Sequence, residues 1–157
     1  MKRKNYLVRT AMALLTLFAT IGAKADELTI HDGTETNSTV PVYGYNVDGY
    51  SRSQFIIPAS TLVSMQWGNI NKLTFYASQT SVSWGKATFL VYLSEVEETT
   101  VASLKDWGSL QQVYEGSLSI SDQKMVITLA TPYQYEGGNL LVGINQSVSG
   151  SYSSSSW

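Results

Sequence analysis

Residues 87–94 have the sequence ATFLVYLS, and this stretch decides the fold class. Ala, Phe, Val and Leu occupy the odd-numbered positions, and Thr, Leu, Tyr and Ser occupy the even-numbered ones. Successive side chains of a β-strand point to opposite faces, so the odd-numbered set forms one continuous apolar face. The stretch therefore predicts a strand that packs this face against a core.

Three further stretches, at 72–77, 125–129 and 140–144, show the same alternation. In the last two, the positions in between are also apolar or small, which is typical of central strands covered on both faces. These positions are Val126, Leu141 and Gly143. Shorter candidate strands lie at 27–30, 40–45, 54–57 and 113–120. The alternating positions predict a core of Leu73, Phe75, Phe89, Val91, Leu93, Ile127, Leu129, Leu140, Val142 and Ile144.

Glycine-containing turns separate these stretches, and no long stretch repeats its apolar residues with the period of a helix. One short helical turn is expected at 101–107. Many short strands joined by turns are typical of all-β folds. The sequence therefore predicts an antiparallel two-sheet β-sandwich.

The first 25 residues have the three-part pattern of a secretory signal peptide. Basic side chains open the chain, residues 10–23 are uncharged and mostly apolar, and Ala-Lys-Ala follows at 23–25. A run of 14 such residues is shorter than the roughly 18 needed to cross a bilayer. The predicted organisation is a signal peptide at 1–25, a β-sandwich domain at 26–146, and a serine-rich C-terminal tail or final edge strand at 147–157. Export through the Sec route predicts a secreted or cell-surface location.

The composition excludes several classes of function. Beyond residue 25, five basic residues stand against twelve acidic ones, a net charge of −7. Such a domain offers no electrostatic surface for nucleic acid or an anionic membrane. The absence of cysteine excludes disulfides, thiol catalysis, iron–sulfur centres and cysteine zinc sites.

The residues give little support to an enzyme. His31 and Asp32 are the one neighbouring histidine–carboxylate pair, but no serine lies in the Gly-x-Ser-x-Gly turn that exposes a nucleophile. Glu95, Glu97 and Glu98 could imitate the carboxylate pair of a glycosidase, although a solvated loop explains them as well. We therefore predict no catalytic residue and no cofactor.

A calcium site is a weak alternative, because calcium needs only oxygen ligands. Asp32, Glu35, Asp48 and Asp122 are the loop carboxylates that could contribute, but they lack the spacing of a known calcium loop.

Aromatic residues in predicted turns are the best indication of a binding surface. Tyr43, Tyr45, Trp84 and Trp107 each adjoin a glycine, which cannot screen a neighbouring ring. Rings with polar tips supply large contact areas at binding surfaces. These four residues are the predicted ligand-binding residues. The alternative is that such rings cap the ends of the sandwich core.

Several stretches together resemble a known family. They are LTI at 28–30, DGT at 32–34, VPVY at 40–43, YSRSQ at 50–54, INKLTFY at 70–76, LVYL at 90–93, TLATPY at 128–133 and YEGGNLLV at 135–142. Their order resembles the jelly-roll-like domains of large secreted and surface proteins of Bacteroidetes, akin to cleaved-adhesin domains. The resemblance implies adhesion or binding and no fixed catalytic set. In such domains further strand sequence normally follows residues 139–146, so we expect either a short, serine-rich last strand or a fragment of a longer protein.

The sequence thus predicts a secreted or cell-surface, non-catalytic binding or adhesion module for an extracellular protein or glycan. It predicts no nucleic-acid partner and no stable membrane insertion after the signal is removed. Two alternatives stay open: a pilin-like subunit that exchanges strands with another chain, and an inert spacer domain of a larger surface protein.

Export can be tested on the protein's own N-terminus. If residues 1–25 are a signal peptide, secreted protein should begin at Asp26, or within a residue or two of it. N-terminal sequencing of exported material measures this, and recovery of Met1 would contradict the prediction.

Overall fold

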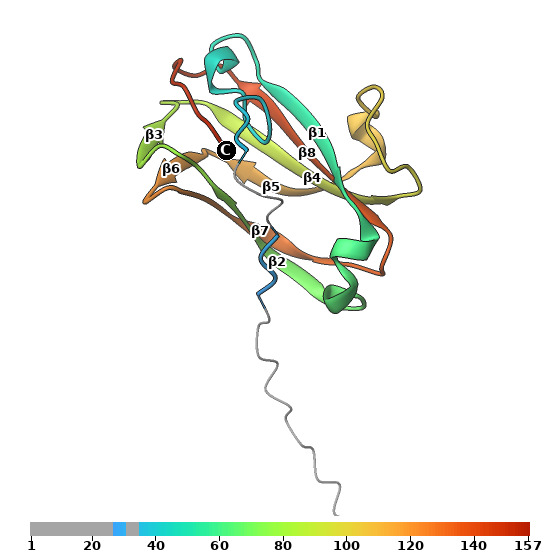
Figure 1. Ribbon diagram of the computed structural model, residues 1–157. Coiled ribbons are helices and arrows are strands. Elements are labelled where there is room, and N and C mark those ends of the chain that lie inside the picture. Colours follow the sequence, from blue (N-terminus) through green and yellow to red (C-terminus); the bar gives the residue numbers. More distant parts are fainter. Residues whose placement is uncertain (1–26, 31–34) are drawn as a thin grey trace, which may run out of the picture.

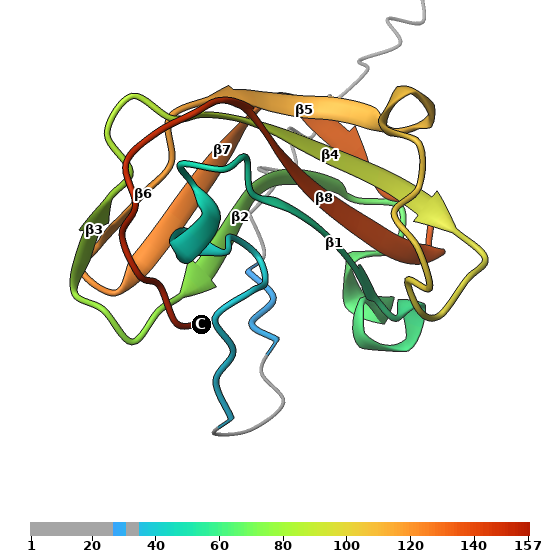
Figure 2. The ribbon, with the colours of Figure 1, turned by 90° about the horizontal axis from the view of Figure 1, so that it is seen from above.

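The computed structural model describes residues 27–30 and 35–157. Two four-stranded sheets face each other with the core between them, as Figures 1 and 2 show. All strand pairs are antiparallel. The chain therefore forms the predicted antiparallel two-sheet β-sandwich.

Strands that are consecutive in the sequence are distributed between the two sheets. The first sheet has the order β1-β8-β4-β5 and the second the order β2-β7-β6-β3. Their bounds are β1 Arg52–Ile57, β2 Asn69–Tyr76, β3 Ser81–Ser83, β4 Thr88–Val96, β5 Gln111–Gly116, β6 Ser119–Ser121, β7 Lys124–Gln134 and β8 Asn139–Val148. Four short 3-10 turns complete the structure: η1 Gly44–Asn46, η2 Ala59–Thr61, η3 Val63–Met65 and η4 Trp107–Ser109.

Strand β4 confirms the alternation that decided the fold class. Phe89, Val91 and Leu93 are completely buried. From the facing sheet, β7 contributes Met125 and Ile127, which are also completely buried. Among the predicted core residues, Leu73 and Phe75 on the edge strand β2 are only half-buried. The core is therefore densest along the central strands and thinner at this edge.

Strands β7 and β8 differ in how their outer faces are covered. On β8 both faces are buried, as predicted, because Trp107 and Leu110 pack with Leu141 on the outer side. A Cβ atom at Gly143 would lie 2.8 Å from Cζ3 of Trp107, so this position needs glycine. On β7 the prediction was wrong: Val126 is 50% exposed, and within residues 27–30 and 35–157 the side chains of β7 alternate between buried and exposed along most of the strand.

Several of the shorter predicted elements need correction. Residues 27–30 and 40–45 form no strand, and η1 takes up the end of the second stretch. Pro41 cannot donate a ladder hydrogen bond, which disfavours a strand there. Residues 113–120 divide into β5 and β6, and the helical turn expected at 101–107 is replaced by η4. The strand expected at 54–57 is confirmed within β1.

Residues 149–157 run back across the end of the sandwich beside the η1 segment (Figure 2). Ser151 N donates to the carbonyl oxygen of Trp84 at 2.9 Å, and Trp157 and Asn37 exchange two backbone hydrogen bonds of 2.8 and 2.9 Å. Ser155 is buried, and the Trp157 ring packs against Phe75. This C-terminal segment is therefore part of the folded domain rather than a detached tail.

No helix within residues 27–30 and 35–157 is long and apolar enough to cross a membrane.

Replacing Phe89 by alanine tests the core. Because the ring is completely buried, the substitution should lower the free energy of unfolding by about 3–5 kcal/mol. Val126→Ala is the matched control, since its half-exposed side chain should change stability by about 0.5 kcal/mol or less. Urea denaturation measures both, and similar losses for the two variants would contradict the proposed faces.

Candidate binding surface at one end of the sandwich

Two of the four predicted binding residues lie exposed at the end of the sandwich formed by η1. Tyr43 is 38% exposed and Tyr45 is 46% exposed, with ring centroids 5.9 Å apart. The residues around them, Val42 and Val47, are completely buried. Burial of the two valines fixes the backbone, and the two tyrosines then point away from the core.

Gly44, between the two tyrosines, brings the C-terminal segment against η1. A Cβ atom at this position would lie 2.1 Å from the carbonyl oxygen of Ser153, so a larger residue would push the segment away. Ser153 N donates to the carbonyl oxygen of Gly44 at 3.3 Å, and Gly44 N donates to Oγ of Ser155 at 3.3 Å. The sequence-distant segments are thereby held side by side.

This contact brings a third tyrosine to the surface. Tyr152 is 58% exposed, and its ring lies 5.3 Å from that of Tyr45 in an edge-to-face arrangement. We call Tyr43, Tyr45 and Tyr152 the tyrosine cluster. The sequence analysis missed Tyr152, because it assigned residues 147–157 to a tail or edge strand. The one local signal was a lone aromatic residue among serines.

Buried polar contacts hold the loop that carries Tyr43 and Tyr45. The Gln146 side chain, only 3% exposed, accepts from Ser51 N at 2.9 Å and donates to the carbonyl oxygen of Val47 at 2.6 Å. Gly150 N donates to the same Val47 oxygen at 3.1 Å. Hydrogen bonds to buried groups are costly to break. Buried hydrogen bonds therefore fix the backbone of the loop that carries Tyr43 and Tyr45.

The prediction that Trp84 is an exposed binding residue was wrong. It is 1% exposed, its indole N–H donates to the carbonyl oxygen of Ser153 at 3.0 Å, and its ring packs edge-on against Phe89 at 5.8 Å. The neighbouring glycine gives it no cover, as expected, but the C-terminal segment does. Trp84 is a core residue that has no surface available to a ligand.

Trp107 is also a packing residue. Its ring lies 5.2 Å from that of Tyr92 and covers Gly143 on the outer face of the first sheet. The half-buried tryptophan therefore completes the small apolar cluster outside β8. Burial, and secondly the charge of Glu115, raise the pKa of Tyr92 above its usual value.

Three other aromatic residues are exposed: Tyr76 on β2, and Tyr50 and Trp67 outside the strands. Tyr50 is 47% exposed, and Trp67 is 69% exposed. Both have left-handed backbone conformations, with φ of 67° and 63°. Trp67 lies beyond the far end of β1, where its N–H donates to the carbonyl oxygen of Tyr135 at 2.9 Å. It is therefore not part of the tyrosine cluster.

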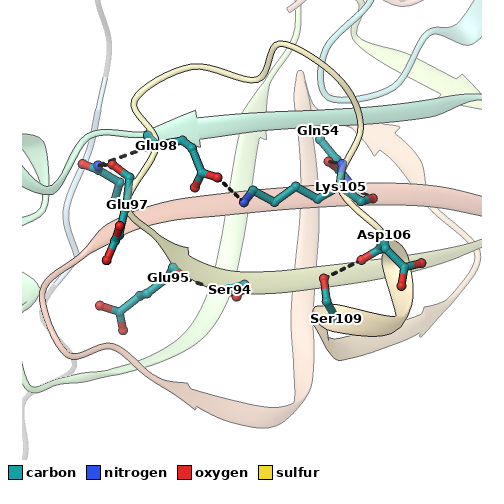
Figure 3. Close-up of polar contacts among 9 residues, drawn as sticks. Gln54, Ser94, Glu95, Glu97, Glu98, Lys105, Asp106 and Ser109 are labelled. Carbon is teal, nitrogen blue, oxygen red and sulfur yellow. Dashed lines mark hydrogen bonds and ion pairs between the residues drawn. The ribbon is translucent and has the colours of Figure 1, made fainter.

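Two of the three glutamates that could have formed a catalytic pair, Glu95 and Glu98, have separate structural contacts. Glu95 accepts hydrogen bonds from the backbone N–H groups of Glu136 and Gly138, at 2.6 and 2.5 Å, and so fixes the turn between β7 and β8. Glu98 forms an ion pair with Lys105 at 2.5 Å. Figure 3 shows the Glu98–Lys105 pair and Glu95 pointing away from each other. The hydrogen bond from Lys105 lowers the pKa of Glu98.

The loop that follows β4 is held in place by further polar contacts. Gln54 and the backbone of Lys105 exchange hydrogen bonds of 2.7 and 3.1 Å. Glu98, Val101 and Lys105 are among the residues that line a shallow pocket of about 250 Å³ beside Ile56. Its charged groups, Glu98 and Lys105, are paired with each other.

The predicted calcium ligands are not brought together in the part of the chain that the structure describes. His31 and Asp32 lie outside the described residues. No three His, Cys, Asp or Glu side chains among those described could hold a metal ion. Asp122 and Gln123 instead form the turn between β6 and β7, with φ of 51° and 61°. Two successive left-handed residues are characteristic of tight hairpin turns.

Trp84 and Tyr45 should respond to substitution in opposite ways. Trp84→Ala should lower the free energy of unfolding by about 3–5 kcal/mol, because it empties part of the core. Tyr45→Ala removes a half-exposed ring and should cost about 1 kcal/mol or less. Chemical denaturation measures both values. A large loss for Tyr45→Ala would show that its ring is a packing residue.

A comparison with protein-family models, with curated proteins and with solved structures gives no match. The resemblance to jelly-roll-like surface domains therefore stays a prediction, which depends on the stretches of sequence quoted for it.

Proposed function

We propose that the chain is a secreted or cell-surface, non-catalytic binding or adhesion module that recognises a protein or a glycan. The tyrosine cluster is the observation that carries this proposal. Its three rings come from two distant segments and meet on one rigid, exposed surface. The η1 segment presents two of the rings, and the fold adds the third from the C-terminal segment.

The physical chemistry of the cluster favours binding. Removing a tyrosine ring from water is favourable, and its hydroxyl group can hydrogen-bond to a partner at the same time. The support fixes both segments through Gly44, Val47 and Gln146. Binding of a partner therefore costs little conformational entropy in this surface, which favours affinity.

Other features support export and the absence of catalysis. The first 25 residues have the pattern of a signal peptide. Glu95 and Glu98 are engaged in a turn and an ion pair, so neither is free to act as an acid or base at a shared site. The resemblance to cleaved-adhesin-like domains adds an expectation of adhesion.

The strand-exchanging alternative loses its supporting feature. It depended on a serine-rich C-terminal segment free to join another chain. Residues 150, 151, 153, 156 and 157 are instead hydrogen-bonded within their own chain.

Binding arrays test the proposal directly. The exported protein should bind a component of a glycan array or an array of extracellular proteins, and the triple variant Tyr43→Ala, Tyr45→Ala, Tyr152→Ala should lose that binding. Losing one true contact ring typically costs about 1–3 kcal/mol of binding free energy. The melting temperature should fall by only a few degrees, since the rings are exposed.

Tyr76→Ala is the matched control. Tyr76 is 49% exposed, but it lies on β2, at the edge of the second sheet, and is not part of the tyrosine cluster. This variant should bind as the unchanged protein does. If the triple variant binds as well as the unchanged protein, the tyrosine cluster is not the binding site. If the unchanged protein binds nothing, an inert spacer is favoured.

A further inference from the structure

In the tyrosine cluster, Tyr45 neighbours both Tyr43 and Tyr152, and the three rings are not coplanar; we call this succession of rings the track. From Tyr43 to Tyr45 the ring centroids are 5.9 Å apart, and from Tyr45 to Tyr152 they are 5.3 Å apart. The two steps are nearly equal and close to the length of one sugar unit in a linear polysaccharide. Each ring could therefore contact a different unit of such a chain.

The angles between the rings restrict the kind of chain that fits. The planes of Tyr43 and Tyr45 are inclined by 48°, and those of Tyr45 and Tyr152 by 64°. A crystalline polysaccharide presents one flat face and could lie against only one of three such rings. A soluble chain whose successive units are rotated can present the C–H face of each unit to a ring in turn.

The groups around the rings favour an uncharged ligand. The two segments at 43–50 and 149–155 carry one charged side chain, Asp48, and are otherwise rich in Ser and Gly, with one Asn. Asn46 and Ser151 are exposed beside the rings. Amide and hydroxyl groups can donate and accept hydrogen bonds, which suits the hydroxyl groups of a sugar.

A folded protein is the alternative partner for this surface, because tyrosine is also enriched at protein–protein interfaces. The buried centre of a protein–protein interface is more apolar than the surface around it. In these two segments the exposed large apolar side chains are all tyrosines, and the exposed aliphatic side chain next to them in sequence is Val148, which directly precedes the second segment. The surface is thus divided into separate rings among polar groups.

We propose that the tyrosine cluster binds a soluble, uncharged polysaccharide chain, with one sugar unit against each tyrosine ring. This inference rests on the proposed binding function and specifies its ligand class.

Affinity electrophoresis tests the inference with defined polysaccharides. The probes are soluble α-glucan, mixed-linkage β-glucan, mannan and xylan, with a sulfated polysaccharide as the charged polymer; crystalline cellulose, the flat polymer, is insoluble and is tested by sedimentation with the protein. At least one soluble neutral chain should retard the protein, whereas crystalline cellulose should bind far more weakly. A charged chain should not be preferred.

Variants of single rings give the quantitative test. Tyr43→Ala, Tyr45→Ala and Tyr152→Ala should each weaken binding by about tenfold. Tyr152→Phe keeps the ring and should weaken binding less than Tyr152→Ala. The control Tyr76→Ala should leave the affinity unchanged, and circular dichroism should show that every variant is folded.

The possible failures are distinguishable. If no soluble neutral polysaccharide binds but a protein binds in a tyrosine-dependent way, the polysaccharide inference is wrong and the binding function stands. If retention on polysaccharide is the same in the alanine variants, the track is not the site. If neither class of ligand depends on the three tyrosines, both proposals fail.

Discussion

The burial of alternate side chains between two facing sheets is the interaction on which the rest of the structure depends. Phe89 on β4, Ile127 on β7 and Val142 on β8 are all completely buried in this layer. Removing such side chains from water provides the main driving force for the fold. The loops at the ends of the sandwich acquire fixed positions because the strands that lead into them are fixed.

The candidate surface depends on further contacts, made by two irregular segments at the end of the sandwich. The η1 segment and the C-terminal segment contribute few regular sheet hydrogen bonds, yet each buries anchor residues, among them Val47 and Ser155. Gln146 joins the central strand to the η1 loop through its side chain. Rigid strands thereby position irregular loops, which is the common arrangement of binding surfaces on β-sandwiches.

Much of the strand pattern could be predicted from the sequence, because strand side chains alternate wherever one face is buried. The alternation identified β4 and β8 correctly, but it could not tell which apolar outer faces are covered. Leu141 and Val126 look alike in sequence, and only the packing of Trp107 and Leu110 over β8 separates them.

The surface itself could be predicted only in part. Tyr43 and Tyr45 were identified from a local feature, the intervening glycine. Trp84 shares that feature but is buried by residues that lie far away in the sequence. Tyr152 joins the cluster through the same long-range contact. A single sequence contains no signal for a pairing of this kind.

If the proposed binding function is right, the close approach of Gly44 to Ser153 also couples ligand binding to folding. Tyr45 and Tyr152 are neighbours only while the C-terminal segment is docked on η1. A ligand that touches both rings binds the docked form alone, and by mass action it opposes release of the segment. Occupancy of the surface would then slow hydrogen exchange at the backbone amides of Ser151 and Ser153, although neither amide needs to touch the ligand.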